Sequence, residues 1–354
     1  MKKKAVIVLI IIFSFLCLAI GGGLAYFNAN LQPVDPTNKE SIEVVIPTGT
    51  ATSQVITMLK EKDLIKNEFV TKVFAKLQSK ELIAGRYMFS KSMSTPEIWK
   101  DICKGNVTRD TIWVTFVEGK RLSYIASQIA ANFPYAEEEV NKVLEDKDYI
   151  KELIQEYYVL TDDILNEKIY HPLEGYLFAD TYEFEKDATI KEIIEKMIGT
   201  LDSKVKKYKD DIENSKYSIH ELMTLASIVE LEASKDERKG VAGVFYNRLK
   251  SGWSLGSDVT TYYAVNKNFD KDLTRSELNS CNAYNTRGSC VKGLPAGPIG
   301  SPSISSIEAA IYPTEHDYYY FVDDKYGKTY YSKTNSEHNA TIRRLQSEGL
   351  WYTY

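Results

Sequence analysis

An uncharged apolar stretch near the N-terminus constrains this chain more than any other feature of its sequence. Residues 5–27 carry no charged side chain and are rich in Ile, Leu, Val and Phe. About 20 such residues are enough for one helix to cross the hydrocarbon core of a membrane. Three lysines at positions 2–4 precede the stretch, and the next basic residue is Lys39. This bias predicts a cytoplasmic N-terminus, with all later residues outside the cytoplasm.

A cleaved signal peptide is the alternative interpretation of this stretch. Signal peptides have apolar cores of only about 7 to 15 residues, so its length favours a retained membrane anchor. The expected layout is a cytoplasmic tail at residues 1–4, a transmembrane helix at 5–27 and a linker at 28–40. The linker contains Pro33 and Pro36 and shows no hydrophobic period.

The remaining composition excludes several classes of protein. Lys and Arg number 44 against 49 Asp and Glu, and three of the lysines precede the apolar stretch, so nucleic-acid binding is disfavoured. The four histidines form no HExxH pair, and no GxSxG elbow is present. We therefore expect no metal and no cofactor. Cys281 and Cys290 are interpreted either as a disulfide or as two free thiols.

The folded part is expected to be α+β and to contain two regions, residues 41–115 and 116–354. The first region is predicted to be a βααβ unit, with strands at 42–46 and 84–89 and helices at about 51–62 and 67–78. Ser94 and Glu97 form a capping box that predicts another helix. A strand over 108–117 is expected to close the first region.

Capping boxes also predict the main helices of the second region. They are Thr189 with Glu192, Ser218 with Glu221, and Ser234 with Glu237. The segment HPLEGYLFADTYEF, which begins at His171, is typical of a shaped surface loop. Near the C-terminus the pattern predicts a hairpin of strands 318–322 and 329–332, followed by a helix from about Glu337.

Glu230 is the main candidate for chemistry. It continues the apolar stripe of Ile219, Met223 and Ala226 on one face of a predicted helix. The last turn of a helix is negative, and partial burial also disfavours a charge, so the pattern predicts that Glu230 holds a proton. Glu232 points away and is expected to be a solvated helix end. The alternative is a structural Glu230 paired with Arg248.

Several segments carry a resemblance to a known family. LASIVELEA from Leu225 and GVFYNRL from Gly243 resemble the signature helices of the endolytic murein transglycosylases, the YceG-like or MltG proteins. The similarity continues through HPLEGYLFADTYEF, LGSDVTTYYAV, NAYNT, GLPAGPIGSP and SEHNATIRR. It implies a transmembrane helix, a LysM-like subdomain at 41–115 and an α+β catalytic domain at 116–354.

The resemblance also implies roles for particular residues. Glu230 would be the catalytic acid and base, and the glycan-binding groove would be lined by Glu174, Asn247, Arg248, Asp258, Tyr284 and Asn285. The chain departs from the family pattern around Asp258, where it has Gly256 and Val259, and after NAYNT, where Arg287 replaces a second Tyr.

The implied activity is cleavage of the MurNAc–GlcNAc β-1,4 bond within peptidoglycan glycan strands. The 6-hydroxyl of the N-acetylmuramic acid would attack its own anomeric carbon, which gives 1,6-anhydro ends and terminates strand growth. Penicillin-binding proteins and other wall-synthesis proteins are the implied partners. Two alternatives stay open: a non-catalytic peptidoglycan-binding protein, and a hydrolytic muramidase with Asp258 as its second carboxylate.

Overall fold

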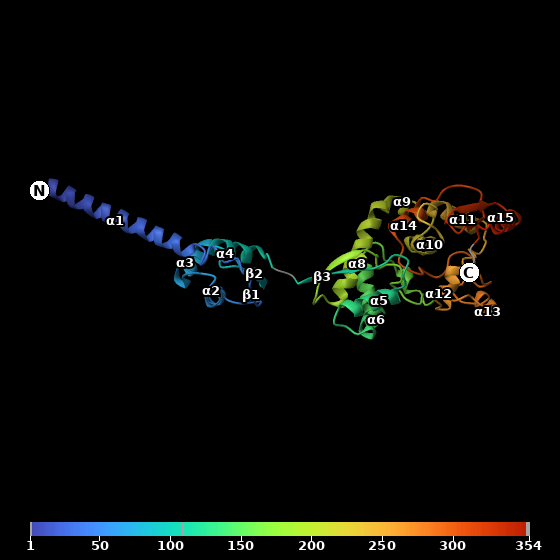
Figure 1. Ribbon diagram of the computed structural model, residues 1–354, viewed down its shortest axis with the longest axis horizontal. Coiled ribbons are helices and arrows are strands. Elements are labelled where there is room, and N and C mark those ends of the chain that lie inside the picture. Colours follow the sequence, from blue (N-terminus) through green and yellow to red (C-terminus); the bar gives the residue numbers. More distant parts are fainter. Residues whose placement is uncertain (1, 108–109, 352–354) are drawn as a thin grey trace. The chain divides into compact units, whose positions relative to one another are not determined.

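The described residues form a mixed α+β protein with two compact units. The computed structural model describes residues 2–107 and 110–351. Unit 1 is Met1–Asp110 and unit 2 is Thr111–Tyr354; they are coloured blue to cyan and green to red in Figure 1. The expected α+β class is confirmed.

Unit 1 begins with one long helix, α1 (Lys2–Leu31). Among the residues that the structure describes, this is the one helix long and apolar enough to cross a membrane, and the qualifying segment is Phe13–Leu31. The helix extends beyond the expected anchor into the predicted linker. No proline interrupts it before Pro33, and Leu31 is buried against the rest of unit 1.

The rest of unit 1 confirms the predicted βααβ order. Its elements are β1 (Ile42–Ile46), α2 (Thr52–Glu61), α3 (Glu68–Gln78), β2 (Gly85–Phe89) and α4 (Thr95–Lys104). The two strands are antiparallel, with Val44 opposite Tyr87. Alternate side chains such as Val44 and Ile46 point into a core formed with the helices. The backbone N–H of Ser94 donates to Glu97 at 2.7 Å, as the capping box predicts.

The boundary between the two units differs from the expected one between residues 115 and 116. The strand expected at 108–117 is β3 (Thr111–Thr115), while residues 108 and 109 lie outside the described part of the chain. It pairs in antiparallel fashion with β4 (Thr181–Glu185) and therefore belongs to unit 2. A local pattern identifies a strand but not its distant partner, so the sequence assigned it to the wrong unit.

Unit 2 is mainly helical. Before α10 it contains α5 (Leu122–Asn132), α6 (Glu137–Leu144), α7 (Lys147–Glu156), η1 (Asp162–Leu165), α8 (Ile190–Val205), η2 (Lys206–Tyr208) and α9 (Lys209–Glu213). Then follow α10 (Ile219–Glu232), α11 (Arg238–Lys250), α12 (Asp258–Ala264), α13 (Arg275–Leu278), α14 (Ile304–Ile311), β5 (Tyr320–Asp323), β6 (Thr329–Ser332) and α15 (Asn335–Ser347). The predicted C-terminal hairpin is β5 with β6, and α15 is the predicted last helix.

Two of the three capping boxes expected in unit 2 are confirmed. Thr189 and Ser218 begin α8 and α10. The third prediction is wrong, because α11 begins at Arg238 and Ser234 lies in a turn. The Glu237 carboxylate accepts a hydrogen bond from the Tyr331 hydroxyl at 2.7 Å, so it is engaged by the C-terminal hairpin instead of Ser234.

The segment from His171 is not the surface loop that its composition suggests. Leu173, Tyr176 and Leu177 are fully buried in the core of unit 2, and the segment ends in β4. Its aromatic and aliphatic side chains fill the core, and burial of this much apolar surface outweighs the Gly and Pro signals for a loop.

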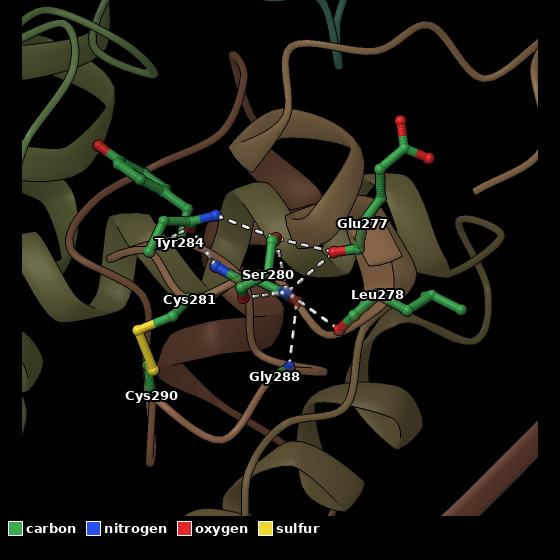
Figure 2. Close-up of a disulfide and its surroundings, with 9 residues drawn as sticks. Glu277, Leu278, Ser280, Cys281, Tyr284, Gly288 and Cys290 are labelled. Carbon is green, nitrogen blue, oxygen red and sulfur yellow. Dashed lines mark hydrogen bonds between the residues drawn. A yellow bond between two sulfur atoms is a disulfide. The ribbon is translucent and has the colours of Figure 1, made fainter. Parts of the chain in front are cut away.

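Cys281 and Cys290 form a disulfide, which resolves the question left open by the sequence. Figure 2 shows it closing a loop that contains Tyr284 and Gly288, with Ser280 directly before the loop. The side chain of Asn285 organises this loop. Its amide nitrogen donates to the Ser280 carbonyl at 2.7 Å, and its oxygen accepts from the Thr261 hydroxyl at 2.7 Å.

Candidate active site

Helix α10 carries Glu230 through the interior of unit 2. Ten of its fourteen residues are buried, so protein surrounds the helix on nearly all sides. It packs against α11 and α14, which lie beside it in Figure 1. The capping box at Ser218 fixes its start, and the extended residue Ala233 ends it. Glu230 thus lies in the last turn, as the sequence predicts.

The Glu230 carboxylate is surrounded by four hydrogen-bond donors. Arg238 donates from Nη2 to Oε1 at 2.6 Å. The second oxygen, Oε2, accepts from the Ser303 backbone N–H at 2.9 Å, the Ser303 hydroxyl at 2.5 Å and the Ser306 hydroxyl at 2.7 Å. The Glu230 side chain is only 7% exposed. Charge-assisted contacts of this kind are strong when water is excluded.

Three of these four donors come from the start of helix α14, and Arg238 comes from α11. Ser303 is the N-cap residue of α14, and its hydroxyl accepts from the Ser306 N–H at 3.3 Å. The N-terminus of a helix is its positive end and stabilises a nearby anion. The negative end of α10 therefore does not act alone on Glu230. The expectation that Glu230 holds a proton considered the end of α10 alone, and it stays a prediction.

The alternative interpretation, in which Glu230 pairs with Arg248, is contradicted by the structure. Arg248 donates from Nε to the Tyr319 carbonyl at 2.8 Å and from Nη1 to the Leu255 carbonyl. It therefore holds the loops before α12 and β5. The salt-bridge partner is Arg238, eight residues after Glu230. An arginine in the first turn of α11 can reach back across the turn that separates the two helices.

Glu232 is not the solvated helix end that the sequence suggests. Its carboxylate accepts a hydrogen bond from the Ser257 hydroxyl at 2.5 Å. Burial raises the pKa of Glu232. Its surroundings are the loop before α12, away from the contacts of Glu230. Two carboxylates on one helix end thus have separate environments.

A loop pairing brings a second segment against Glu230. The backbone N–H of Gly119 donates to the Ser301 carbonyl at 2.8 Å, and the Ser301 N–H donates to the Lys120 carbonyl at 2.9 Å. A Cβ atom on Gly119 would lie 3.2 Å from Leu231 Cδ2 and 3.6 Å from Glu230 Cγ. Gly119 also has φ +71°, so a glycine suits both the backbone and the close approach.

Glu230 opens on a cavity of about 630 Å³. One wall is formed by the segment from Glu118 to Arg121, and another by Tyr263 and residues 267–270. Tyr124, Tyr263 and Phe269 supply aromatic surface, while Lys120, Arg121 and Lys267 supply positive charge. The cavity can therefore hold a polar ligand with flat apolar faces.

Glu118 is a second carboxylate in the same cavity. Burial and then the negative charge of Glu230 raise the pKa of Glu118. Sequence analysis did not identify Glu118 as a site residue; it stands in the segment VTFVEGKRLSYIASQI, which begins at Val114. The signal that could have found it is the Glu-Gly pair after a strand, which places a carboxylate at a turn.

A smaller cavity of about 230 Å³ adjoins the first. The two share Arg121, Ser123 and Tyr263 as lining residues, and Glu174 lines the smaller one. Glu174 accepts a hydrogen bond from the Leu122 N–H at 2.8 Å and is 2% exposed. Burial raises the pKa of Glu174 to about 7. Glu174, one of the residues expected to line the groove, thus lines the cavity next to that of Glu230.

The raised pKa of Glu174 predicts a pH-dependent stability. Because the unfolded chain has an ordinary Glu pKa of about 4.3, the group's contribution is fully present below that pH and is lost as pH rises through about 7. Between about pH 5 and 8, we expect the parent to lose on the order of 2 kcal/mol of unfolding free energy relative to Glu174→Gln. Urea unfolding of both proteins measures this; an equal difference at both pH values would contradict it.

The other expected groove residues lie elsewhere. Tyr284 is fully buried behind Tyr170 and Tyr263, at centroid distances of 4.6 and 4.8 Å, and so supports the wall of the smaller cavity. Asn285 is buried in the disulfide loop. Asp258 pairs with Arg287 at 3.1 Å on the surface.

Asn247 faces a third cavity, formed by α11 and the segment after α14. It donates to the carbonyls of His316 at 2.8 Å and Tyr318 at 2.9 Å. Neither Asn247 nor Arg248 lines the cavity of Glu230. The residues that sequence reasoning missed are Glu118, Arg238, Ser303 and Ser306. Arg238 lies on the helix that follows α10, whereas the other three reach Glu230 from distant parts of the chain.

The chain is similar to known proteins of one family. The sequence model of the YceG-like family matches residues 44–344. The endolytic murein transglycosylase of Bacillus subtilis is 37% identical over 334 residues, which cover 93% of this chain and 92% of that protein. The endolytic murein transglycosylase of Streptococcus pneumoniae is 32% identical, and the match covers 96% of this chain and 65% of that protein.

A solved structure is also similar. The crystal structure of a YceG-like protein from Listeria monocytogenes matches with a TM-score of 0.62 and 37% sequence identity. The match covers 86% of this chain and 99% of that one. Both the sequence match and the structural match therefore extend over most of the chain, and the family model spans the segments that form the cavity of Glu230.

Proposed function

Because the chain belongs to the YceG-like family, and curated relatives are named endolytic murein transglycosylases, we propose that it cuts peptidoglycan glycan strands within their length. The reaction is a lyase reaction at the MurNAc–GlcNAc β-1,4 bond, and it leaves 1,6-anhydroMurNAc ends. The observation that carries the proposed site is the carboxylate of Glu230, held by four donors at the edge of a cavity with aromatic walls.

Glu230 acts as acid and then as base. Its proton passes to the glycosidic oxygen as the bond from the anomeric carbon to that oxygen breaks. The 6-hydroxyl of the same N-acetylmuramic acid then bonds to the anomeric carbon and returns its proton to Glu230. No water is consumed. An intramolecular nucleophile has a high effective concentration, so a cavity that orients the sugar favours ring closure over hydrolysis.

The hydroxyl of Ser306 can change its hydrogen-bonding role when Glu230 gains or loses the proton. The Ser303 hydroxyl accepts from Arg238 at 2.7 Å and from the Ser306 N–H, so both of its lone pairs are used and its proton points to Glu230. The Ser306 hydroxyl donates to Glu230 and has lone pairs to spare. A hydroxyl can rotate and reverse its role, so Ser306 can accept a hydrogen bond when Glu230 is protonated.

The decisive test of the function is digestion of purified sacculi by the full chain, with the masses of the products recorded. A transglycosylase gives anhydro ends, which lack one water relative to reducing ends. Anhydro-muropeptides as the main products support the proposal. Reducing ends as the main products would replace it with a muramidase, and an unchanged sacculus would favour a binding protein.

The muramidase alternative has a specific candidate for its second carboxylate. Asp258, the residue expected in that role, is paired with Arg287 and does not line the cavity, whereas Glu118 does. A hydrolase needs two carboxylates at the scissile bond. The transglycosylase mechanism needs only one carboxylate. Cleavage should therefore require Glu118 if the protein is a muramidase, and should not require it if the protein is a transglycosylase.

We expect Glu118→Gln to retain cleavage within about tenfold of the parent and to give the same anhydro products. Product masses and cleavage rates measure both properties. Loss of cleavage on the scale of the Glu230→Gln variant would favour hydrolysis by two carboxylates.

We also propose roles for the two units and for helix α1. Unit 1 beyond α1 is a LysM-like subdomain, and unit 2 is the catalytic domain that contains the cavity of Glu230. Helix α1 is a single-pass anchor with a cytoplasmic N-terminus, supported by the lysines before it. Glu174 and Tyr284 support the glycan groove. Penicillin-binding proteins and other wall-synthesis proteins are the proposed partners.

A further inference from the structure

The outward side of helix α3 in unit 1 carries large apolar side chains that nothing in the described structure covers. Phe69 is 75% exposed, Leu77 is 74% exposed and Val73 is 38% exposed. They are four residues apart, so they lie on one face of the helix. The opposite face, with Val70, Thr71 and Ala75, is buried against unit 1. Exposure of three large apolar side chains in one row indicates a binding surface.

The charges on the same face are positive. Lys72 and Lys76 are exposed between the apolar residues, and Lys80 follows the helix. Two acidic residues lie near these lysines: Glu68 pairs with Lys72 at 3.4 Å, and Glu81 directly follows Lys80. Apolar side chains bordered by lysines are the signature of a helix that lies in a membrane interface. The long lysine side chains can place their charges at the lipid headgroups.

Helix α3 begins where α1 ends. The Asn67 side chain donates to the Tyr26 hydroxyl at 3.4 Å, and Lys66 Nζ donates to the Ala29 carbonyl at 3.5 Å. Figure 1 shows α3 beside this end of α1. If residues 5–27 cross the membrane, Tyr26 lies at its outer surface, the level at which tyrosines are enriched. The start of α3 is then held at the headgroups.

We propose that the outward face of α3 rests on the outer surface of the membrane that α1 crosses, with Phe69, Val73 and Leu77 inserted below the headgroups and Lys72 and Lys76 against lipid phosphates. The proposal rests on the membrane span of the proposed function and not on the cleavage activity. Its occupant is an anionic phospholipid surface. The contact fixes the height of unit 1 above the membrane at a second point besides α1.

The test uses the full chain in vesicles of phosphatidylglycerol and phosphatidylcholine, prepared with ordinary or brominated acyl chains. Brominated chains quench a tryptophan that they touch. Phe69→Trp places the probe on the α3 face, and Val45→Trp is the matched control. Val45 is 52% exposed on β1, and β1 lies at the other end of unit 1 from the start of α3 in Figure 1. Both sites are exposed and apolar, so neither change disturbs the core.

We expect brominated lipid to remove about half of the emission that Phe69→Trp adds to the parent spectrum, and to leave that of Val45→Trp unchanged. Equal quenching of the two variants would overturn the proposal. The proposal would also be overturned if quenching of the Phe69→Trp emission fell as the density of protein in the vesicles rose. That outcome would indicate that a second copy of the chain covers α3. Release of the chain by carbonate washing would overturn the membrane span itself, which separates the two failures.

Discussion

Replacing Glu230 with Gln is expected to lower the release of anhydro-muropeptides from sacculi on the order of 10³-fold. The amide of Gln has nearly the same shape, and its single oxygen can accept from either Arg238 or Ser303. It cannot give a proton to the glycosidic oxygen. Binding of the glycan should change little, because the cavity walls stay in place. The loss should therefore fall on kcat and not on KM.

Glu232→Gln is the matched control for this experiment. The two carboxylates leave the same helix end, and both accept hydrogen bonds from serine hydroxyls. Glu232 faces Ser257 in the loop before α12 instead of the cavity. Its variant should cleave sacculi at close to the parent rate. If Glu230→Gln also cleaved at the parent rate, another residue would have to supply the proton, and the proposed site would be wrong.

Replacing Arg238 with Met is expected to lower the free energy of unfolding by about 3 to 5 kcal/mol. The change leaves the Glu230 carboxylate buried without its ion-pair partner, and it removes the donor to the Ser303 hydroxyl at 2.7 Å. A methionine fills similar volume, so the loss reports the uncompensated charge more than a cavity. Urea unfolding of the full chain measures the effect.

Two comparisons make the Arg238 prediction specific. Lys239→Met removes an exposed cation from the next position of the same helix and should cost little. Arg238→Met placed on Glu230→Gln should cost less than on the parent, because no buried anion is then left alone. Equal costs in the two backgrounds would show that Arg238 stabilises the fold through other contacts than Glu230.

Local sequence patterns predicted the elements that carry the site, and distant contacts explain what they missed. The capping box of Ser218 with Glu221 and the apolar stripe of α10 are local signals, so the helix and the position of Glu230 in its last turn could be predicted. The donors from Ser303 and Ser306 lie more than seventy residues along the chain. No local pattern shows that the start of α14 faces the end of α10.

The predictions from sequence that were wrong also failed because of contacts between distant parts of the chain. Strand β3 was assigned to the wrong unit because its partner is β4, 66 to 72 residues away in the pairs joined by side-chain hydrogen bonds. The Ser234 capping box failed because the Glu237 side chain is bound by Tyr331. Arg248, the alternative partner of Glu230, donates instead to backbone carbonyls. In each case tertiary packing decided the partner, and a local pattern does not show it.

Because α10 is buried on nearly every side, little of the substrate's binding energy is needed to position the acid. A carboxylate at the end of a core helix does not share the local motions of surface loops. Core helices open to solvent only when the whole domain unfolds. The acid is therefore preorganised before a glycan strand arrives, and no reorganisation of its surroundings accompanies bond breaking. Adaptation to strands of different composition then falls to the cavity's outer walls.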